Sequence, residues 1–178
     1  MLVNHDIQFA FIHAGKCAGI ALSQWLLNHY EFEYYGDPDA KVPGTNIVER
    51  HRFTIPEEFR DYEVITSVRE PFKRWESFYL YQNLVMGFDI PFDQFTRERL
   101  DWVSKQNDYA SKANFILHVE SLAEDVLKLP FVKQPVPEIP RLNVSRDQAR
   151  YDEIKSRIVW TIELRSLVAE HFKEDFDL

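Results

Sequence analysis

The sequence is poor in several features, and each shortage excludes a class of protein. Its single cysteine, Cys17, rules out an internal disulfide and suits a reducing compartment such as the cytoplasm. No apolar stretch reaches the length of about 18 residues that a membrane-spanning helix needs. No basic segment followed by a long apolar run marks a signal peptide. We therefore expect a cytoplasmic protein with no membrane partner.

Positive charge is also scarce. The chain has 21 lysine and arginine residues against 29 aspartate and glutamate residues, which gives a formal net charge of -8. Proteins that bind nucleic acid in general take much of their affinity from a basic surface, so this composition argues against a nucleic-acid partner. A small anion remains possible as a ligand, because a local cluster of basic side chains is enough to hold one.

The composition that remains is that of a globular protein. Of the 178 residues, 45% are hydrophobic and 15% are aromatic, enough to bury a single core. No internal repeat, low-complexity segment or linker divides the chain. We therefore predict one domain over residues 1–178.

Strand and helix patterns alternate along the chain, which predicts an α/β protein with parallel strands joined by crossovers. The loops that follow His13 and Val68 then fall at the carboxyl ends of strands, where such sheets bind ligands. We expect strands over 7–13, 63–68 and 115–119, and helices over 18–30, 71–86, 92–104, 122–129 and 147–172, the last as one helix or two. A helical turn is expected at 55–59, and loops over 37–45 and 130–140.

The first of these loops, F-I-H-A-G-K-C-A-G over residues 11–19, has features of an anion site. Small residues let an anion approach the N–H groups at a helix N-terminus, and Lys16 adds a full positive charge. It is not a kinase-type loop, because no serine or threonine follows Lys16 to hold magnesium. The alternative is a tight turn with a surface lysine. Cys17, at a helix N-terminus beside Lys16, is expected to have a lowered pKa but a structural or ligand-lining role.

The second loop begins the stretch V-R-E-P-F-K-R-W-E-S-F-Y, residues 68–79. Arg69 follows a strand and Ser77 lies on the helix that Pro71 begins, so both can reach one phosphate. Arginine suits that task because its planar fork donates two parallel hydrogen bonds to phosphate oxygens. The alternative is that Arg69 pairs with Glu70 or another carboxylate and that Ser77 is an ordinary helix residue.

The two motifs together resemble those of the Golgi-type, family 2 carbohydrate sulfotransferases and their bacterial relatives. That family has a loop of the form H-I-P-K-C-G-G-T-S after one strand and V-R-[DN]-P-x-x-R-x-x-S-x-Y after a later one. Two looser matches are F-I-L-H-V-E-S-L over residues 115–122 and R-L-N-V-S over residues 141–145. The matches cover most of the chain between residues 9 and 146.

The resemblance implies a three-layer, P-loop-like α/β fold with a central, mostly parallel sheet flanked by helices. It also implies the sulfuryl donor 3′-phosphoadenosine-5′-phosphosulfate (PAPS), no metal, and a hydroxyl of a carbohydrate or small molecule as acceptor. Arg69 and Ser77 would hold the 3′-phosphate, and Lys16 would stabilise charge on the bridging oxygen during transfer. The 5′-phosphosulfate would lie against Gly15, Lys16, Cys17, Ala18, Gly19, Ile20 and Ala21.

The base that takes the acceptor's proton is expected in the stretch V-E-R-H-R-F, residues 48–53. We choose His51, because an imidazole is neutral near pH 7; Glu49 is the second candidate, and a plain surface histidine is the alternative. Ile20 and Ala21 stand where the family has threonine and serine. Two other functions therefore stay open, a non-catalytic or weakly active nucleotide-binding relative and a P-loop kinase-like phosphotransferase.

Overall fold

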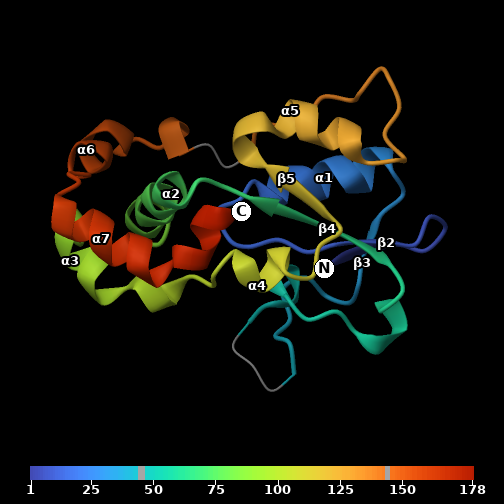
Figure 1. Cartoon of the computed structure of the whole chain (residues 1–178). Helices are drawn as coiled ribbons and strands as arrows, with labels where there is room; N and C mark the ends of the chain where they lie inside the picture. Colours follow the sequence, from blue (N-terminus) through green and yellow to red (C-terminus); the bar gives the residue numbers. More distant parts are fainter. Residues whose placement is uncertain (44–46, 143–144) are drawn as a thin grey trace.

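The computed structural model of the protein describes residues 1–43, 47–142 and 145–178. Within these ranges a five-stranded sheet has the order β3-β1-β2-β4-β5 (Figure 1). Strand β2 pairs with β4, and β4 with β5, in parallel, whereas β1 pairs antiparallel with both β2 and β3. The strands are β1 (Leu2–Asn4), β2 (Phe9–Phe11), β3 (Glu33–Tyr34), β4 (Glu63–Val68) and β5 (Phe115–His118).

The predicted fold class is wrong in one respect. The chain is α/β, but its sheet is small and mixed, with an antiparallel edge, and is not plainly the three-layer P-loop-like fold with a mostly parallel sheet. The two strands that change the class are β1 and β3, which span three and two residues. Segments this short show no alternation of apolar and polar residues, so a pattern search passes over them.

The expected helices are present but several are shorter than predicted. Pro71 fills the first position of α2 (Pro71–Leu84), and the Glu70 carboxylate accepts hydrogen bonds from the N–H groups of Phe72 and Lys73 at 3.1 and 2.8 Å. The region 147–172 is two helices, α6 (Tyr151–Ser156) and α7 (Ile162–His171), and the Thr161 hydroxyl caps the second. The remaining α-helices are α1 (Gly19–His29), α3 (Phe92–Glu98), α4 (Asn107–Ala110) and α5 (Leu122–Asp125).

Strand residues alternate between two apolar cores on opposite faces of the sheet. Phe9 and Phe11 pack toward α1 and α5, whereas Ala10 and Ile12 pack toward α4 on the other face. A third core, built around Trp75 and joining α2, α3, α6 and α7, forms a helical group beside the sheet (Figure 1). Strand β4 runs directly into α2 of this group, so the carboxyl ends of the parallel strands meet it.

Parts of two segments considered in the sequence analysis cannot be compared with the structure. Residues 44 and 45 of the expected loop 37–45, and residues 143 and 144 of the motif over 141–145, lie outside the described residues. Across the part of the chain that the structure describes, no helix is both long enough and apolar enough to cross a membrane.

Candidate functional site

A cavity of about 1110 Å³ lies where the parallel strands end. The loop after β2, the first residue after β4 and the inner side of α2 all contribute to its wall. It therefore brings together the two motifs that lie some fifty residues apart in sequence, and His51 with them. The predicted site residues that line it are Gly15, Lys16, Ala18, Gly19, Ile20, Ala21, His51, Arg69 and Ser77.

The backbone of the first loop adopts the left-handed conformation twice. Lys16 has φ of 69° and Ala18 has φ of 57°, and Cys17 between them does not share it. An alternation of this kind turns successive N–H groups to one side, as anion-binding turns do. Helix α1 then begins with no side chain capping its first turn. The N–H groups of that turn are therefore available to a ligand in the cavity.

The carbonyl groups of the same loop are bound from behind by the protein. Ser67 of β4 donates to the Cys17 carbonyl at 2.6 Å, and the Arg74 guanidinium donates to the Gly15 carbonyl at 3.0 Å. Both donors are buried. This arrangement fixes the strained loop and occupies two of its carbonyl groups.

Relief of the strain at Ala18 should be measurable. Replacing Ala18 by glycine removes the Cβ that disfavours a φ of 57°, so we expect Ala18→Gly to raise the free energy of unfolding by about 1 kcal/mol. Gly87 is the matched control, because it has φ of 76° and open space around it. Gly87→Ala should lower stability by a similar amount in urea unfolding. Equal stability of Ala18→Gly and wild type would contradict the strain.

Lys16 is a partly buried cation in the cavity wall. Its ammonium nitrogen lies 4.1 Å from the centre of the Tyr81 ring, and the structure gives it no ion pair within the described residues. Burial, and then the nearby positive charge of Arg69, lower the pKa of Lys16 to about 8. An anion bound beside it would raise that pKa again, because the opposite charge stabilises the protonated form of Lys16.

Arg69 brings a second cation, which forms no ion pair with a carboxylate of the described residues. The Nε atom of its side chain is buried without a hydrogen-bond partner. Glu70, the partner considered from the sequence, uses its carboxylate to cap α2 instead. Ser77, nearly two turns into α2, lines the same cavity as Arg69. A buried N–H of guanidinium without an acceptor is costly, and a phosphate oxygen would satisfy it.

Cys17 is the one predicted donor-binding residue that does not line the cavity. It is fully buried, and burial raises the pKa of its thiol to about 11, so the expected lowering by the helix N-terminus and Lys16 is wrong. The thiol donates a hydrogen bond to the Gln106 carboxamide oxygen at 3.0 Å. This role is structural.

Gln106 is a residue that sequence patterns do not reveal. The side-chain oxygen of Gln106 is fully buried and accepts hydrogen bonds from the backbone N–H of Arg69 at 2.7 Å and from the Cys17 thiol. The side-chain nitrogen donates to the backbone carbonyl of Arg69 at 2.9 Å. One carboxamide thus joins the first loop to the second. Its own backbone N–H donates to Asp175 at 2.9 Å.

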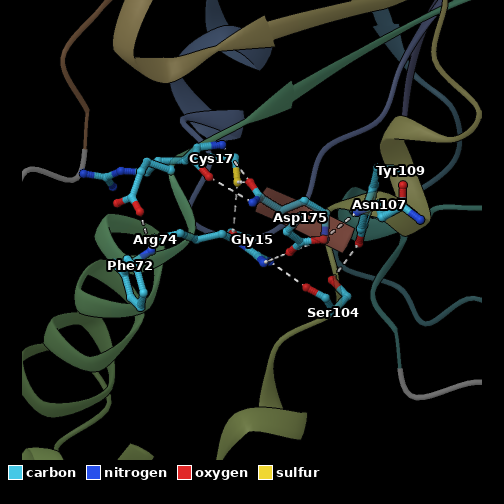
Figure 2. Close-up of polar contacts among 11 residues, drawn as sticks. Gly15, Cys17, Phe72, Arg74, Ser104, Asn107, Tyr109 and Asp175 are labelled. Atoms are coloured by element: carbon cyan, nitrogen blue, oxygen red, sulfur yellow. Dashed lines mark hydrogen bonds and ion pairs between the residues drawn. The ribbon is translucent and has the colours of Figure 1, made fainter. Parts of the chain in front are cut away.

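Arg74 and Asp175 complete this support from behind the cavity. Figure 2 shows the Arg74 guanidinium between Gly15, Ser104 and Asp175. Asp175 accepts from Arg74 at 3.5 Å and from the N–H groups of Gln106 and Asn107 at 2.9 Å each. The C-terminal segment therefore helps to hold the loop that carries Lys16.

His51 lines the cavity and Glu49 does not. The Glu49 carboxylate is bound by the Arg52 guanidinium, whose Nε donates at 2.7 Å and which lowers the pKa of Glu49. His51 Nδ1 lies 3.5 Å from the His13 carbonyl, which only accepts, so the proton belongs on Nδ1 and Nε2 keeps its lone pair. Burial lowers the pKa of His51, and the imidazole is neutral at pH 7.

His13 fills the space behind the loop. Its ring is buried, stacks on Phe11 and meets the His51 ring edge-on at 4.9 Å between centroids. Burial, followed by repulsion from His51, holds the pKa of His13 well below 6.5. A Cβ at Gly19 would lie 1.9 Å from His13 Cδ2, so only glycine fits there.

Within the described ranges, no three histidine, cysteine, aspartate or glutamate side chains cluster in a way that would hold a metal ion. Comparison of the chain with protein-family models, with curated proteins and with solved structures gives no match.

Proposed function

We propose that the cavity binds PAPS and that the protein transfers its sulfuryl group to an acceptor hydroxyl, of a carbohydrate or another small molecule. The observation that carries the proposal is the meeting of Lys16 and Arg69, two cations with no described carboxylate partner, at the uncapped N-terminus of α1. Lys16 and Arg69 lie in the same cavity although the protein has a net charge of -8. Two cations in one cavity favour a ligand with several negative charges.

The two motifs divide the donor between them. The first loop and Lys16 bind the 5′-phosphosulfate through N–H groups and one full charge. Arg69 and Ser77 bind the 3′-phosphate, and Gln106 sets the distance between the two sites because it bonds to both loops. Ile20 and Ala21 supply no hydroxyl, so donor affinity rests on backbone N–H groups and these two cations.

In the transfer step the acceptor oxygen forms a bond to sulfur as the bond from sulfur to the bridging oxygen breaks. The products are a sulfate ester and adenosine 3′,5′-bisphosphate. Lys16 stabilises the negative charge that builds on the bridging oxygen. The acceptor's proton passes to Nε2 of His51, whose lone pair is free because Nδ1 holds the proton.

Two other functions make different predictions in the same assay. Stabilisation by adenosine 3′,5′-bisphosphate in a thermal-shift experiment supports a PAPS site, whereas stabilisation by ATP with magnesium alone supports a kinase-like phosphotransferase. A weakly active nucleotide-binding relative binds the bisphosphate but forms little sulfate ester from PAPS. A non-catalytic relative that has lost the donor site binds neither ligand, and the replaced residues Ile20 and Ala21 favour that candidate. Stabilisation by neither ligand overturns the proposed donor site.

Affinity for the bisphosphate should fall as pH rises above 8. The free protein loses the Lys16 proton near pH 8, and a bound anion raises that pKa, so binding takes up a proton above pH 8. We expect the dissociation constant to rise by up to about tenfold per pH unit between pH 8 and 9.5. Calorimetric titrations from pH 7 to 9.5 measure this. Lys16→Met should bind the bisphosphate more weakly, with a dissociation constant that does not change with pH. If the dissociation constant of this variant rises with pH as that of wild type does, a group other than Lys16 takes up the proton.

A further inference from the structure

The cavity extends beyond the two anion-binding motifs on the α4 side of the sheet. We call this part the Trp102 lobe. The Tyr109 hydroxyl joins its segments, because it donates to the His51 carbonyl at 2.8 Å and lies 3.2 Å from the Ser104 hydroxyl. Val103 adjoins the first loop, 3.9 Å from the Cβ position of Gly15. The lobe is lined by Ile47, Val48, Arg50, His51, Trp102, Val103, Ser104 and Tyr109.

Most polar groups of the Trp102 lobe already have partners in the protein. The Tyr109 and Ser104 hydroxyls bind as just described, and the Arg50 guanidinium pairs with Asp39 and the Pro38 carbonyl. Among the described residues that line the whole cavity, Glu138 is the single carboxylate, there is no asparagine or glutamine, and Glu138 is not one of the eight residues of the lobe. A sugar presents several hydroxyls that must exchange water for protein partners, and each one left unpaired costs affinity.

The aromatic surface of the lobe is, in contrast, partly exposed. Trp102 is 43% exposed although it is a large apolar side chain. The Arg99 guanidinium lies 4.4 Å from the centre of its ring, and Phe88 meets it edge-on at 5.5 Å. A flat ligand can stack on the face of the ring that Arg99 does not cover.

We propose that the Trp102 lobe holds the acceptor and that the acceptor is a planar aromatic hydroxy compound, a phenol or naphthol, rather than a carbohydrate. This inference rests on the proposed donor site. The acceptor's ring stacks on Trp102, and its hydroxyl is directed to the first loop beside His51.

The chemistry of the step agrees with this class. The phenol oxygen bonds to sulfur, the bond from sulfur to the bridging oxygen breaks, and the phenolic proton moves to His51 Nε2. The products are an aryl sulfate and adenosine 3′,5′-bisphosphate. A phenol, with a pKa near that of tyrosine at about 10, gives up its proton far more easily than a sugar hydroxyl. The His51 imidazole is half-buried and burial lowers its pKa, so it suits an acceptor that gives up its proton easily.

The test uses 2-naphthol as the aromatic probe and N-acetylglucosamine as the sugar probe, each titrated by calorimetry into protein saturated with adenosine 3′,5′-bisphosphate. We expect 2-naphthol to bind and the sugar not to. Trp102→Ala should weaken 2-naphthol binding roughly tenfold through lost stacking. Tyr34→Ala is the matched control, because Tyr34 is 40% exposed on β3 and lies outside the cavity lining. It should leave binding unchanged. With PAPS, formation of naphthyl sulfate is measured by mass spectrometry.

The outcomes separate the two proposals. If the bisphosphate itself does not bind, both the proposed donor site and the acceptor assignment that rests on it are wrong. If the bisphosphate binds but 2-naphthol does not, or if Trp102→Ala and Tyr34→Ala bind 2-naphthol equally, the aromatic acceptor is wrong while the donor site stands. Preference for N-acetylglucosamine over 2-naphthol also overturns the aromatic class.

Discussion

Arg74→Met is expected to lower the free energy of unfolding by about 3–5 kcal/mol, the cost of leaving a buried charge without its partner. Arg74 and Asp175 are both buried, and the guanidinium also donates to the carbonyls of Gly15 and Ser104. Methionine preserves much of the volume but none of these hydrogen bonds. Urea unfolding followed by circular dichroism measures the change.

The matched control for that variant is Arg97→Met. Arg97 pairs with Glu163 at 2.6 Å on the exposed surface, where an ion pair contributes little. Its loss should leave the urea midpoint nearly unchanged. A further variant, Arg74→Met with Asp175→Asn, removes the uncompensated carboxylate and should recover part of the lost stability. Equal effects of Arg74→Met and Arg97→Met would refute a supporting role for the buried pair.

Gly19→Ala is the second change with a large expected effect. The new methyl group would lie 1.9 Å from His13 Cδ2, and the His13 ring cannot retreat because Phe11 and His51 pack against it. Overpacking of this kind costs about 3 kcal/mol in the free energy of unfolding. The displaced loop should also lose affinity for adenosine 3′,5′-bisphosphate.

Gly15 lies in the same loop and provides the control for Gly19. A Cβ at Gly15 would meet only Val103, at an ordinary contact distance of 3.9 Å. Gly15→Ala should therefore leave the fold intact in urea unfolding. If the clash with His13 is the cause, the double variant His13→Ala with Gly19→Ala will lose less stability than the sum of the two single changes. Additive losses would mean that the clash is absent.

The sequence predicts the parts of the structure that depend on local signals. Strand β4 spans residues 63–68 as expected, because its β-branched run is bounded clearly and five of its six residues are buried. Helices α1 and α2 lie within the predicted ranges, since apolar residues at helical spacing indicate the first and Pro71 marks where the second begins. The cavity contains both motifs because parallel strands place their following loops at one edge.

What the sequence does not predict depends on contacts between distant residues. Strands β1 and β3 gain their structure from pairing with neighbours rather than from their own few residues, and they make the sheet mixed. Gln106 has no motif around it, and its importance comes from contacts with Cys17, Arg69 and Asp175. The pKa of Cys17 was predicted with the wrong sign because burial outweighs the nearby positive charges.

Titration calorimetry with adenosine 3′,5′-bisphosphate, on wild type, Arg69→Met and Arg97→Met, tests the donor site most directly. Arg69 has a buried Nε with no protein acceptor, whereas Arg97 lies on the exposed surface in an ion pair. The donor site predicts one molecule bound per chain at pH 7, a loss of affinity of about 30-fold in Arg69→Met, and unchanged binding in Arg97→Met. Absence of binding to wild type, or equal affinity in Arg69→Met, would contradict it.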